Sequence, residues 1–213
     1  MLIEFIEGPL WTISVVIFLV GVSYRLYANH RLGVKADLAP ARPHPAGGSG
    51  HTVLGRFLPR REFMRQAMFV MVVGYVFHIA LFVLLFFPEP HVRFIEQCIL
   101  GFGWPAVPYW AFVLSAALTL ASLVLLWMRR LLDPVRKKIS TADDHLTALL
   151  LIAAILSGFM AMQQTYDLPR VLHLLLVELL LIYFPFSRLM HAFTIFFSRA
   201  YTGASYARRG VKV

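Results

Sequence analysis

The chain has 213 residues, 59% of them hydrophobic, and its mean hydropathy of +0.71 excludes a soluble domain, whose surface must be largely polar. A net charge of +9 could indicate nucleic-acid binding, but the charges are segregated along the chain as in membrane proteins, so we expect no nucleic-acid partner. A single cysteine, Cys98, excludes an intramolecular disulfide, a cysteine-bound iron–sulfur cluster and C-x-x-C-H haem attachment. Any cofactor therefore needs other, noncovalent ligands.

Five stretches are apolar and long enough to cross a bilayer, whose hydrocarbon core takes about 20 helical residues. The first follows Glu4 and Glu7 instead of basic residues and has no small-residue cleavage site, so we expect a retained membrane helix. The last is overlong and is expected to leave the membrane near its end. The sequence predicts an all-α integral membrane protein, a five-helix bundle forming one domain over residues 1–213, with spans near residues 10–28, 66–87, 108–128, 145–163 and 171–197.

Basic residues alternate with acidic residues between these stretches. Residues 25–65 carry eight Lys or Arg, residues 129–138 carry five and the tail from Arg199 carries four, whereas the other loops carry only Arg93 and Arg170. Because basic loops stay cytoplasmic, we expect the N-terminus outside and the C-terminus in the cytoplasm, in the cell inner (cytoplasmic) membrane. The basic loop at about residues 29–65 is either a solvated connector or a surface that docks a soluble partner or anionic lipid.

Three histidines, His78, His173 and His191, lie within the apolar stretches, where an ionisable side chain is costly and indicates function. His173 and His191 are 18 residues apart, which on a continuous helix is five whole turns and about 27 Å. They would then share one face, one near each side of the membrane. This arrangement favours two haem b groups held by histidines of facing helices.

Topology suggests how these histidines pair. The second and fifth helices run in opposite directions, so His78 can meet His191 near the cytoplasmic side, and His173 lies near the outer side. His91 is on the correct side to be its partner but follows Pro88 and Pro90, at or beyond the end of the second helix. Each histidine alone could instead be a hydrogen-bonded packing residue or part of a proton relay.

The chain resembles, over nearly its whole length, the gamma subunit of respiratory nitrate reductase and its relatives, including the membrane cytochrome linked to dissimilatory sulfite reduction. The resemblance is carried by Phe77-His78-Ile79, by Arg129-Arg130-Leu131 with Asp133-Pro134-Val135-Arg136, and by His173-Leu174 followed by Phe184-Pro185-Phe186-Ser187-Arg188-Leu189-Met190-His191.

The resemblance implies a five-helix dihaem cytochrome b that exchanges electrons with quinone and with a cytoplasmic iron–sulfur subunit serving a catalytic subunit. It implies that His78 and His191 bind the inner haem and that His173 binds the outer haem. The family's second histidine of the outer haem corresponds here to Pro88. Either His91 replaces it, or the outer haem is absent or bound differently.

Four further residues are candidates for these functions. Arg188 could pair with a propionate of the inner haem or be a positive-inside anchor, and Arg170 could serve the outer haem. Glu178, the only carboxylate inside a predicted span, could carry protons for quinol chemistry or make a hydrogen-bonded interhelical contact. Arg93 is a further candidate for a quinone site near the outer haem.

The leading hypothesis is an electron-transfer subunit of a membrane-bound oxidoreductase with quinol or quinone activity, in which partners carry out the terminal reaction. Electron flow in either direction is compatible with the residues. The alternatives are a haem-free membrane anchor for a soluble enzyme and a proton-relay or transporter subunit that uses Glu178 and the histidines.

Overall fold

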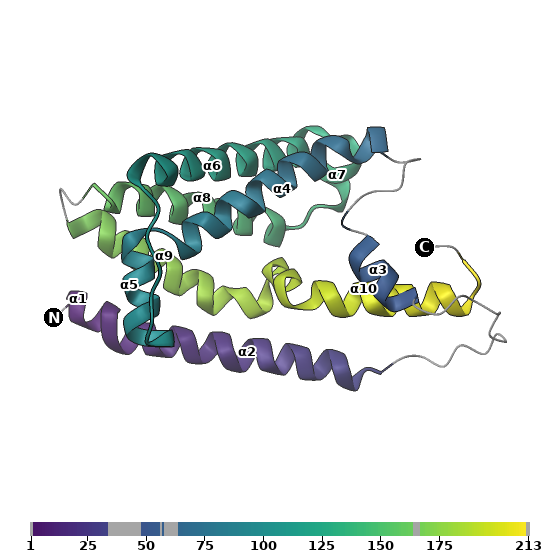
Figure 1. Cartoon of the computed structure of the whole chain (residues 1–213), viewed down its shortest axis with the longest axis horizontal. Coiled ribbons are helices and arrows are strands. Elements are labelled where there is room, and N and C mark those ends of the chain that lie inside the picture. Colours follow the sequence, from purple (N-terminus) through teal and green to yellow (C-terminus); the bar gives the residue numbers. More distant parts are fainter. Residues whose placement is uncertain (1, 34–47, 56, 58–63, 164–166, 212–213) are drawn as a thin grey trace. The chain divides into compact units, whose positions relative to one another are not determined.

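The structure is a computed structural model that describes residues 2–33, 48–55, 57, 64–163 and 167–211. All regular elements within these ranges are helical, as Figure 1 shows. Five helical segments are long and apolar enough to cross a membrane: Ile3–Arg31, Met64–Phe86, Tyr109–Leu132, Ala142–Ala161 and Asp167–Phe186. The expected all-α, five-helix, multi-pass membrane fold is confirmed. The orientation of the termini stays a prediction.

The chain divides into two compact units, one comprising Met1–Leu10 with Gln66–Leu180 and the other comprising Trp11–Arg65 with Leu181–Val213. The expectation of a single membrane domain stays a prediction. The basic loop at about residues 29–65 lies largely outside the described residues.

The first unit contains most of the membrane helices. Its elements are α1 (Leu2–Phe5), η1 (Ile6–Leu10), α4 (Met64–Phe86), α5 (Glu89–Ile95), η3 (Glu96–Leu100), α6 (Tyr109–Leu132), α7 (Pro134–Ile139), α8 (Ala142–Ala161) and α9 (Asp167–Tyr183). Helices α6 and α8 pack side by side (Figure 1). Small buried residues of α6, among them Ser115, Ala116 and Thr119, permit close helix packing of the kind that stabilises membrane bundles. A core cluster forms around Phe77, Leu123 and Ala148.

Helix α4 ends at Phe86 because proline follows at position 88 and cannot continue the helical hydrogen bonding. The loop before α6 then satisfies the carbonyl groups left at this end. Trp104 Nε1 donates to the Phe86 carbonyl oxygen at 3.0 Å, and the Val107 N–H donates to the Phe87 carbonyl oxygen at 3.0 Å. Cys98, in η3 after α5, is a free and exposed thiol.

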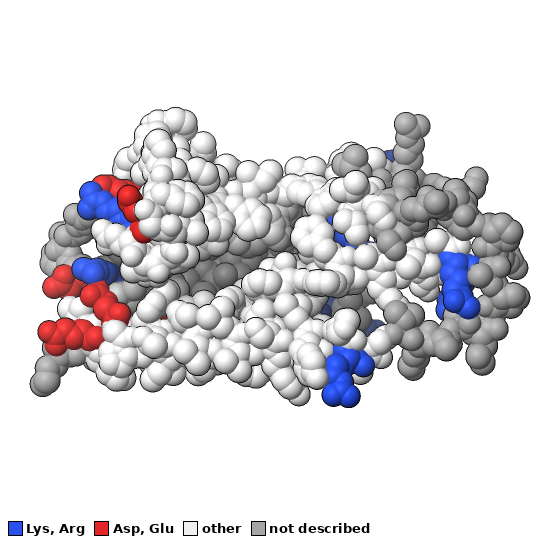
Figure 2. Space-filling view, turned by 60° about the horizontal axis from the view of Figure 1, so that its bottom comes forward, with Lys and Arg blue, Asp and Glu red and all other residues white. Residues whose placement is uncertain are grey.

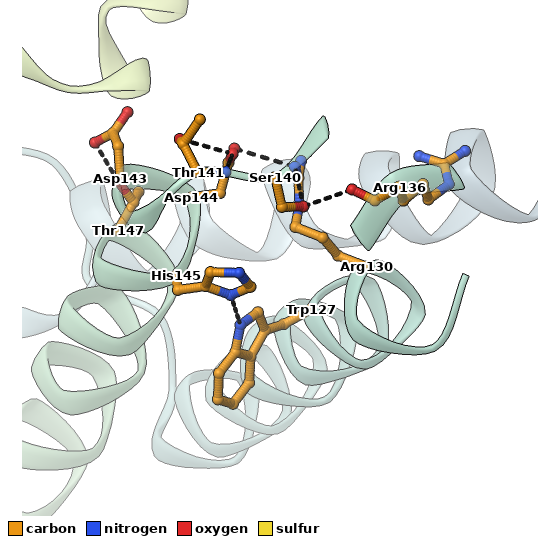
Figure 3. Close-up of polar contacts among 9 residues, drawn as sticks. All are labelled: Trp127, Arg130, Arg136, Ser140, Thr141, Asp143, Asp144, His145 and Thr147. Atoms are coloured by element: carbon orange, nitrogen blue, oxygen red, sulfur yellow. Dashed lines mark hydrogen bonds and ion pairs between the residues drawn. The ribbon is translucent and has the colours of Figure 1, made fainter. Parts of the chain in front are cut away.

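A polar network joins α6, α7 and α8 at the end of α6 where basic residues gather (Figure 3). Asp144 pairs with Arg130 at 3.1 Å, and its other oxygen accepts both the N–H and the hydroxyl of Thr141, forming a capping box at the start of α8. Trp127 Nε1 donates to His145 Nδ1 at 3.1 Å. These contacts fix the connection between two membrane helices.

Replacing Asp144 with alanine is expected to lower the free energy of unfolding by about 2–4 kcal/mol, since it removes a helix cap and strands the half-buried Arg130 without its carboxylate. Unfolding by a denaturing detergent, followed by circular dichroism in mixed micelles, measures the change. Asp143→Ala is the matched control, because it removes the same charge from the neighbouring position of the first turn of α8, while the capping box and the pairing with Arg130 belong to Asp144. Equal stabilities of the two variants would contradict this role of Asp144.

The second unit contains α2 (Trp11–Arg31), α3 (Gly48–Gly55), η4 (Phe184–Phe186), η5 (Arg188–Met190) and α10 (His191–Arg208), with α3 packed on α10 and α2 on η4. Gly21 of α2 lies directly against the Pro185 ring, where a Cβ would come within 2.6 Å of it. Phe18 packs edge-to-face on Phe184, with ring centroids 5.2 Å apart.

The expectation of one continuous helix over residues 171–197 is wrong. Helix α9 ends at Tyr183, two short 3-10 turns follow, and α10 begins at His191. Pro185 lacks the N–H that a continuing helix needs, and the Ser187 hydroxyl instead accepts the Leu189 N–H at 3.1 Å to start the next turn. His173 and His191 therefore belong to two different helices and do not share one face of a single helix.

Candidate functional site

His91 and His173 lie close together in the first unit. Their ring centroids are 6.2 Å apart, and the two ring planes differ by 13°. His91 belongs to α5 and His173 to α9, so residues 82 positions apart in the sequence are brought together. The predicted partnership of these two histidines is thus compatible with their positions.

The orientation of His91 follows from the proline at position 88. In an unbroken helix the Leu84 carbonyl would accept the N–H of residue 88, which proline lacks. Its oxygen lies 2.9 Å from His91 Nδ1 instead, and the Leu85 carbonyl oxygen lies 3.1 Å from the same nitrogen. Pro88 therefore frees a carbonyl group that orients His91.

The orientation of His173 is set by α8. Its Nδ1 lies 3.0 Å from the Ala154 carbonyl oxygen and 3.4 Å from the Ser157 hydroxyl. Gly158 provides the space for the ring, because a Cβ there would lie 2.8 Å from His173 Cε1 and 3.0 Å from Nδ1. Ala154, Ser157 and Gly158 lie within little more than one turn of α8, and together they form a seat for this imidazole.

These contacts define the tautomer. A carbonyl oxygen only accepts, so Nδ1 of both rings carries the proton, and in the neutral ring Nε2 keeps its lone pair. Burial lowers the pKa of His91, and the opposing effects of its bonds to Leu84 and Leu85 are smaller. The neutral ring is the form that binds metals.

The two other candidate histidines show the same pattern. His78 Nδ1 lies 2.6 Å from the Gly74 carbonyl oxygen, and His191 Nδ1 lies 2.7 Å from the Arg188 carbonyl oxygen. His145 is different, since its Nδ1 accepts a hydrogen bond from Trp127. Hydrogen bonding through the second ring nitrogen is typical of metal-binding histidines, and the four candidates share it.

The spacing of His91 and His173 suits one shared metal ion. Metal–imidazole bonds are about 2 Å long, so two imidazoles on opposite sides of one metal have centres about 6 Å apart. Among the residues that the structure describes, no group of three or more His, Cys, Asp or Glu could hold a metal ion. The pair itself therefore offers two nitrogen ligands.

His78 and His191 belong to different units, so their predicted pairing stays a prediction. His78 is exposed on α4 beside the core residue Phe77, whose ring packs edge-to-face on it at 5.0 Å. His191 is the first residue of α10 and is also exposed.

The candidate arginines have partners within their own helices or units. Arg170 pairs with Glu7 of η1, and Arg93 pairs with Glu89 one turn earlier at 2.5 Å, with both side chains mostly exposed. Arg188 is exposed in η5, three residues before His191. Figure 2 shows acidic side chains lying next to basic ones in this view. The roles of these arginines at propionates or quinone stay predictions.

Glu178 of α9 is only 2% exposed, and neither of its carboxylate oxygens has a hydrogen-bond partner among the described residues. A buried ionised carboxylate without a partner is very costly, so the group is expected to be protonated or to bind something further. The interpretation of Glu178 as a hydrogen-bonded interhelical contact finds no support in the described residues.

No pattern in the sequence indicates that Gly158, Ser157 and the Ala154 carbonyl form the seat of His173. Pro88 is the one signal that could have indicated the orientation of His91, because a proline after a helix always leaves a carbonyl four residues earlier without its usual donor.

Fold and site together define a multi-pass helical membrane protein with a closely spaced pair of carbonyl-oriented histidines. The sequence matches no protein-family model. It is 28% identical over 214 residues to a protein of Nitratidesulfovibrio vulgaris strain Hildenborough, covering 97% of this chain and 94% of that protein. It is also 28% identical over 178 residues to the Hdr-like menaquinol oxidoreductase cytochrome b-like subunit of Archaeoglobus fulgidus, covering 67% of this chain and 53% of that protein. The chain is therefore similar to a cytochrome b-like membrane subunit of an oxidoreductase.

Proposed function

We propose that the protein is a membrane haem b subunit that transfers electrons between the quinone pool and a cytoplasmic iron–sulfur or catalytic partner. The observation that carries the proposal is the pair His91 and His173, 6.2 Å apart with both Nδ1 atoms at backbone carbonyls. The similarity to a cytochrome b-like subunit of a menaquinol oxidoreductase supports the same function.

Haem fits this donor set better than a bare metal ion does. Haem b without a covalent link would take its iron ligands from protein side chains, and the neutral imidazoles of His91 and His173 would provide two of them. His91 and His173 would hold the outer haem, and His78 with His191 would hold the inner one. A bound haem b supplies one-electron transfer, and the chain's residues fix its ligands, exclude water and set its surroundings.

Arg188, close in sequence to His191, and Arg170, on the helix of His173, are proposed partners of haem propionates. For Arg170 this requires exchange of its Glu7 partner or sharing of the guanidinium between two carboxylates. Glu178 is proposed to carry the proton that accompanies quinol oxidation or quinone reduction, since its buried carboxylate has no hydrogen-bond partner among the described residues. Arg93 is proposed to lie near the quinone head group.

The proposed topology places the N-terminus outside and the C-terminus in the cytoplasm of the inner membrane. Its support is the alternation of basic and acidic segments along the sequence. The basic residues of α7 and of the second unit would then face the cytoplasm, where an iron–sulfur subunit and a catalytic subunit would bind.

Haem quantification on the purified full-length chain tests the proposal. We expect about two haem b per chain by the pyridine haemochrome assay and a reduced-minus-oxidised spectrum typical of bis-histidine haem b. One haem per chain would contradict one of the two histidine pairs. A colourless protein from haem-replete cells would contradict electron transfer and leave the haem-free anchor.

A proton-relay or transporter subunit is the second candidate, and the buried carboxylate of Glu178 favours it. Haem content distinguishes the two functions, because a proton relay made of a carboxylate and histidines needs no haem. Proton uptake by vesicles containing the colourless chain would support this alternative.

A further inference from the structure

An open apolar groove of about 530 Å³ lies on the first unit between α4 and α6, away from the histidine pair. It is lined by Phe69, Leu125, Met128, Arg129, Leu132 and Asp133. Four of these side chains are apolar and exposed, and they belong to segments that span the membrane. An occupant of the groove must therefore be apolar along most of its length.

One end of the groove carries positive charge. The guanidinium carbon of Arg129 lies 4.8 Å from the centre of the Phe69 ring, which holds the side chain across the groove. No carboxylate of the described residues lies within the 4.0 Å that defines an ion pair with Arg129. Asp133 interacts with Arg129 electrostatically without forming an ion pair.

The acidic residue that lines the groove, Asp133, already has hydrogen-bond and ion-pair partners. Asp133 caps α7, accepting the N–H groups of Val135 at 2.9 Å and Arg136 at 3.1 Å, and it pairs with the Arg136 side chain at 3.5 Å. The hydrogen bond from the Arg136 N–H is the largest of the effects that lower the pKa of Asp133, so the carboxylate stays ionised in this cap. Its charge is offset mainly by that of Arg136 and to a smaller extent by that of Arg129.

Helix α7 adds two further cations beside the groove. Lys137 and Lys138 are exposed, while Val135 and Ile139 of the same short helix expose apolar side chains. An element with exposed cations and exposed apolar residues at the end of a membrane helix suits the boundary between lipid headgroups and acyl chains. The polar network of Figure 3 holds α7 at this position through Arg130 and Ser140, whose side chains lie 3.2 Å apart.

We propose that this groove binds an anionic phospholipid, with the phosphate at Arg129 and an acyl chain along Phe69, Leu125, Met128 and Leu132. A soluble acidic protein could match the cations but not the apolar groove within the membrane span. A zwitterionic phospholipid could fill the groove but would gain less from the excess of cations. The site does not depend on the proposed haems.

Native mass spectrometry of the full-length chain tests the assignment, in detergent micelles that contain phosphatidylglycerol and phosphatidylcholine with identical acyl chains. We expect preferential retention of phosphatidylglycerol. Arg129→Gln should weaken it about fivefold, which corresponds to about 1 kcal/mol for one basic residue near an anionic headgroup. Arg129→Lys should retain most of the binding, because it keeps the charge.

Arg25→Gln is the matched control, because it removes the same charge from an exposed position of α2 outside the groove. Leu125→Trp fills the groove and is expected to reduce retention of both lipids. Equal binding of the two lipids by the wild-type chain, or equal losses in Arg129→Gln and Arg25→Gln, would overturn the proposal. Displacement of phosphatidylglycerol by added menaquinone would instead identify a quinone groove and overturn the lipid assignment.

Discussion

Replacing His173 with alanine is expected to remove about half of the haem from the purified chain, because one of two proposed haems loses an axial ligand. The remaining haem, on His78 and His191, should keep its absorption spectrum. Haem content per chain and the reduced-minus-oxidised spectrum measure the loss. His91→Ala is expected to give the same result, since the two imidazoles lie within the spacing of one metal centre.

His145→Ala is the matched control for these variants. His145 is also a histidine of a membrane-spanning helix, but its Nδ1 accepts the Trp127 N–H, so it lacks the carbonyl-oriented form of the four candidates. Both haems should remain in this variant. If His91→Ala retained both haems while His173→Ala lost one, the outer haem would have a different second ligand. Full haem content in both variants would refute the site.

Replacing Gly158 with valine is expected to abolish the outer haem nearly as completely as removal of His173. Even the Cβ of alanine would lie 2.8 Å from His173 Cε1, a distance at which the ring must move. Movement would break the hydrogen bond between His173 Nδ1 and the Ala154 carbonyl, which fixes the direction of the lone pair. Gly158→Ala should therefore show an intermediate effect, with lowered haem content or an altered electron paramagnetic resonance spectrum of the oxidised haem.

Gly74→Ala separates this effect from the general consequences of changing a helical glycine. Gly74 also lies within a membrane helix, but a Cβ at this position meets nothing within 4 Å. Alanine keeps the backbone carbonyl oxygen that lies 2.6 Å from His78 Nδ1, so the proposed inner haem should not be affected. Alanine should be neutral or stabilising there, by up to about 1 kcal/mol. Equal haem content in Gly158→Ala, Gly158→Val and Gly74→Ala would show that Gly158 does not position His173.

Much of the fold could be predicted because hydrocarbon imposes strong constraints on sequence. Each membrane helix must satisfy its own backbone and present apolar side chains, so the predicted spans near residues 66–87 and 108–128 lie close to Met64–Phe86 and Tyr109–Leu132. The sequence also suggests that His91 lies near His173. This suggestion depends on topology alone, because both residues are expected on the same side of the membrane.

The interruption between α9 and α10 could not be derived from hydropathy, because four of the seven residues 184–190 are large and apolar and only Arg188 is charged. Pro185 was the available signal, but proline in a membrane helix can also produce only a kink. The contacts that position His173 could not be predicted for a different reason. A glycine such as Gly158 shows its role only when a neighbouring helix brings a ring against it.

Cys98 gives the protein a natural attachment point for chemical probes. Because the chain has a single cysteine and its thiol is exposed in η3, a maleimide dye or a nitroxide label would modify one known position without prior mutagenesis. A membrane-impermeant reagent applied to intact cells and to inverted vesicles would report the sidedness of this loop. A nitroxide at the same position would sense a paramagnetic iron centre through the distance-dependent broadening of its spectrum.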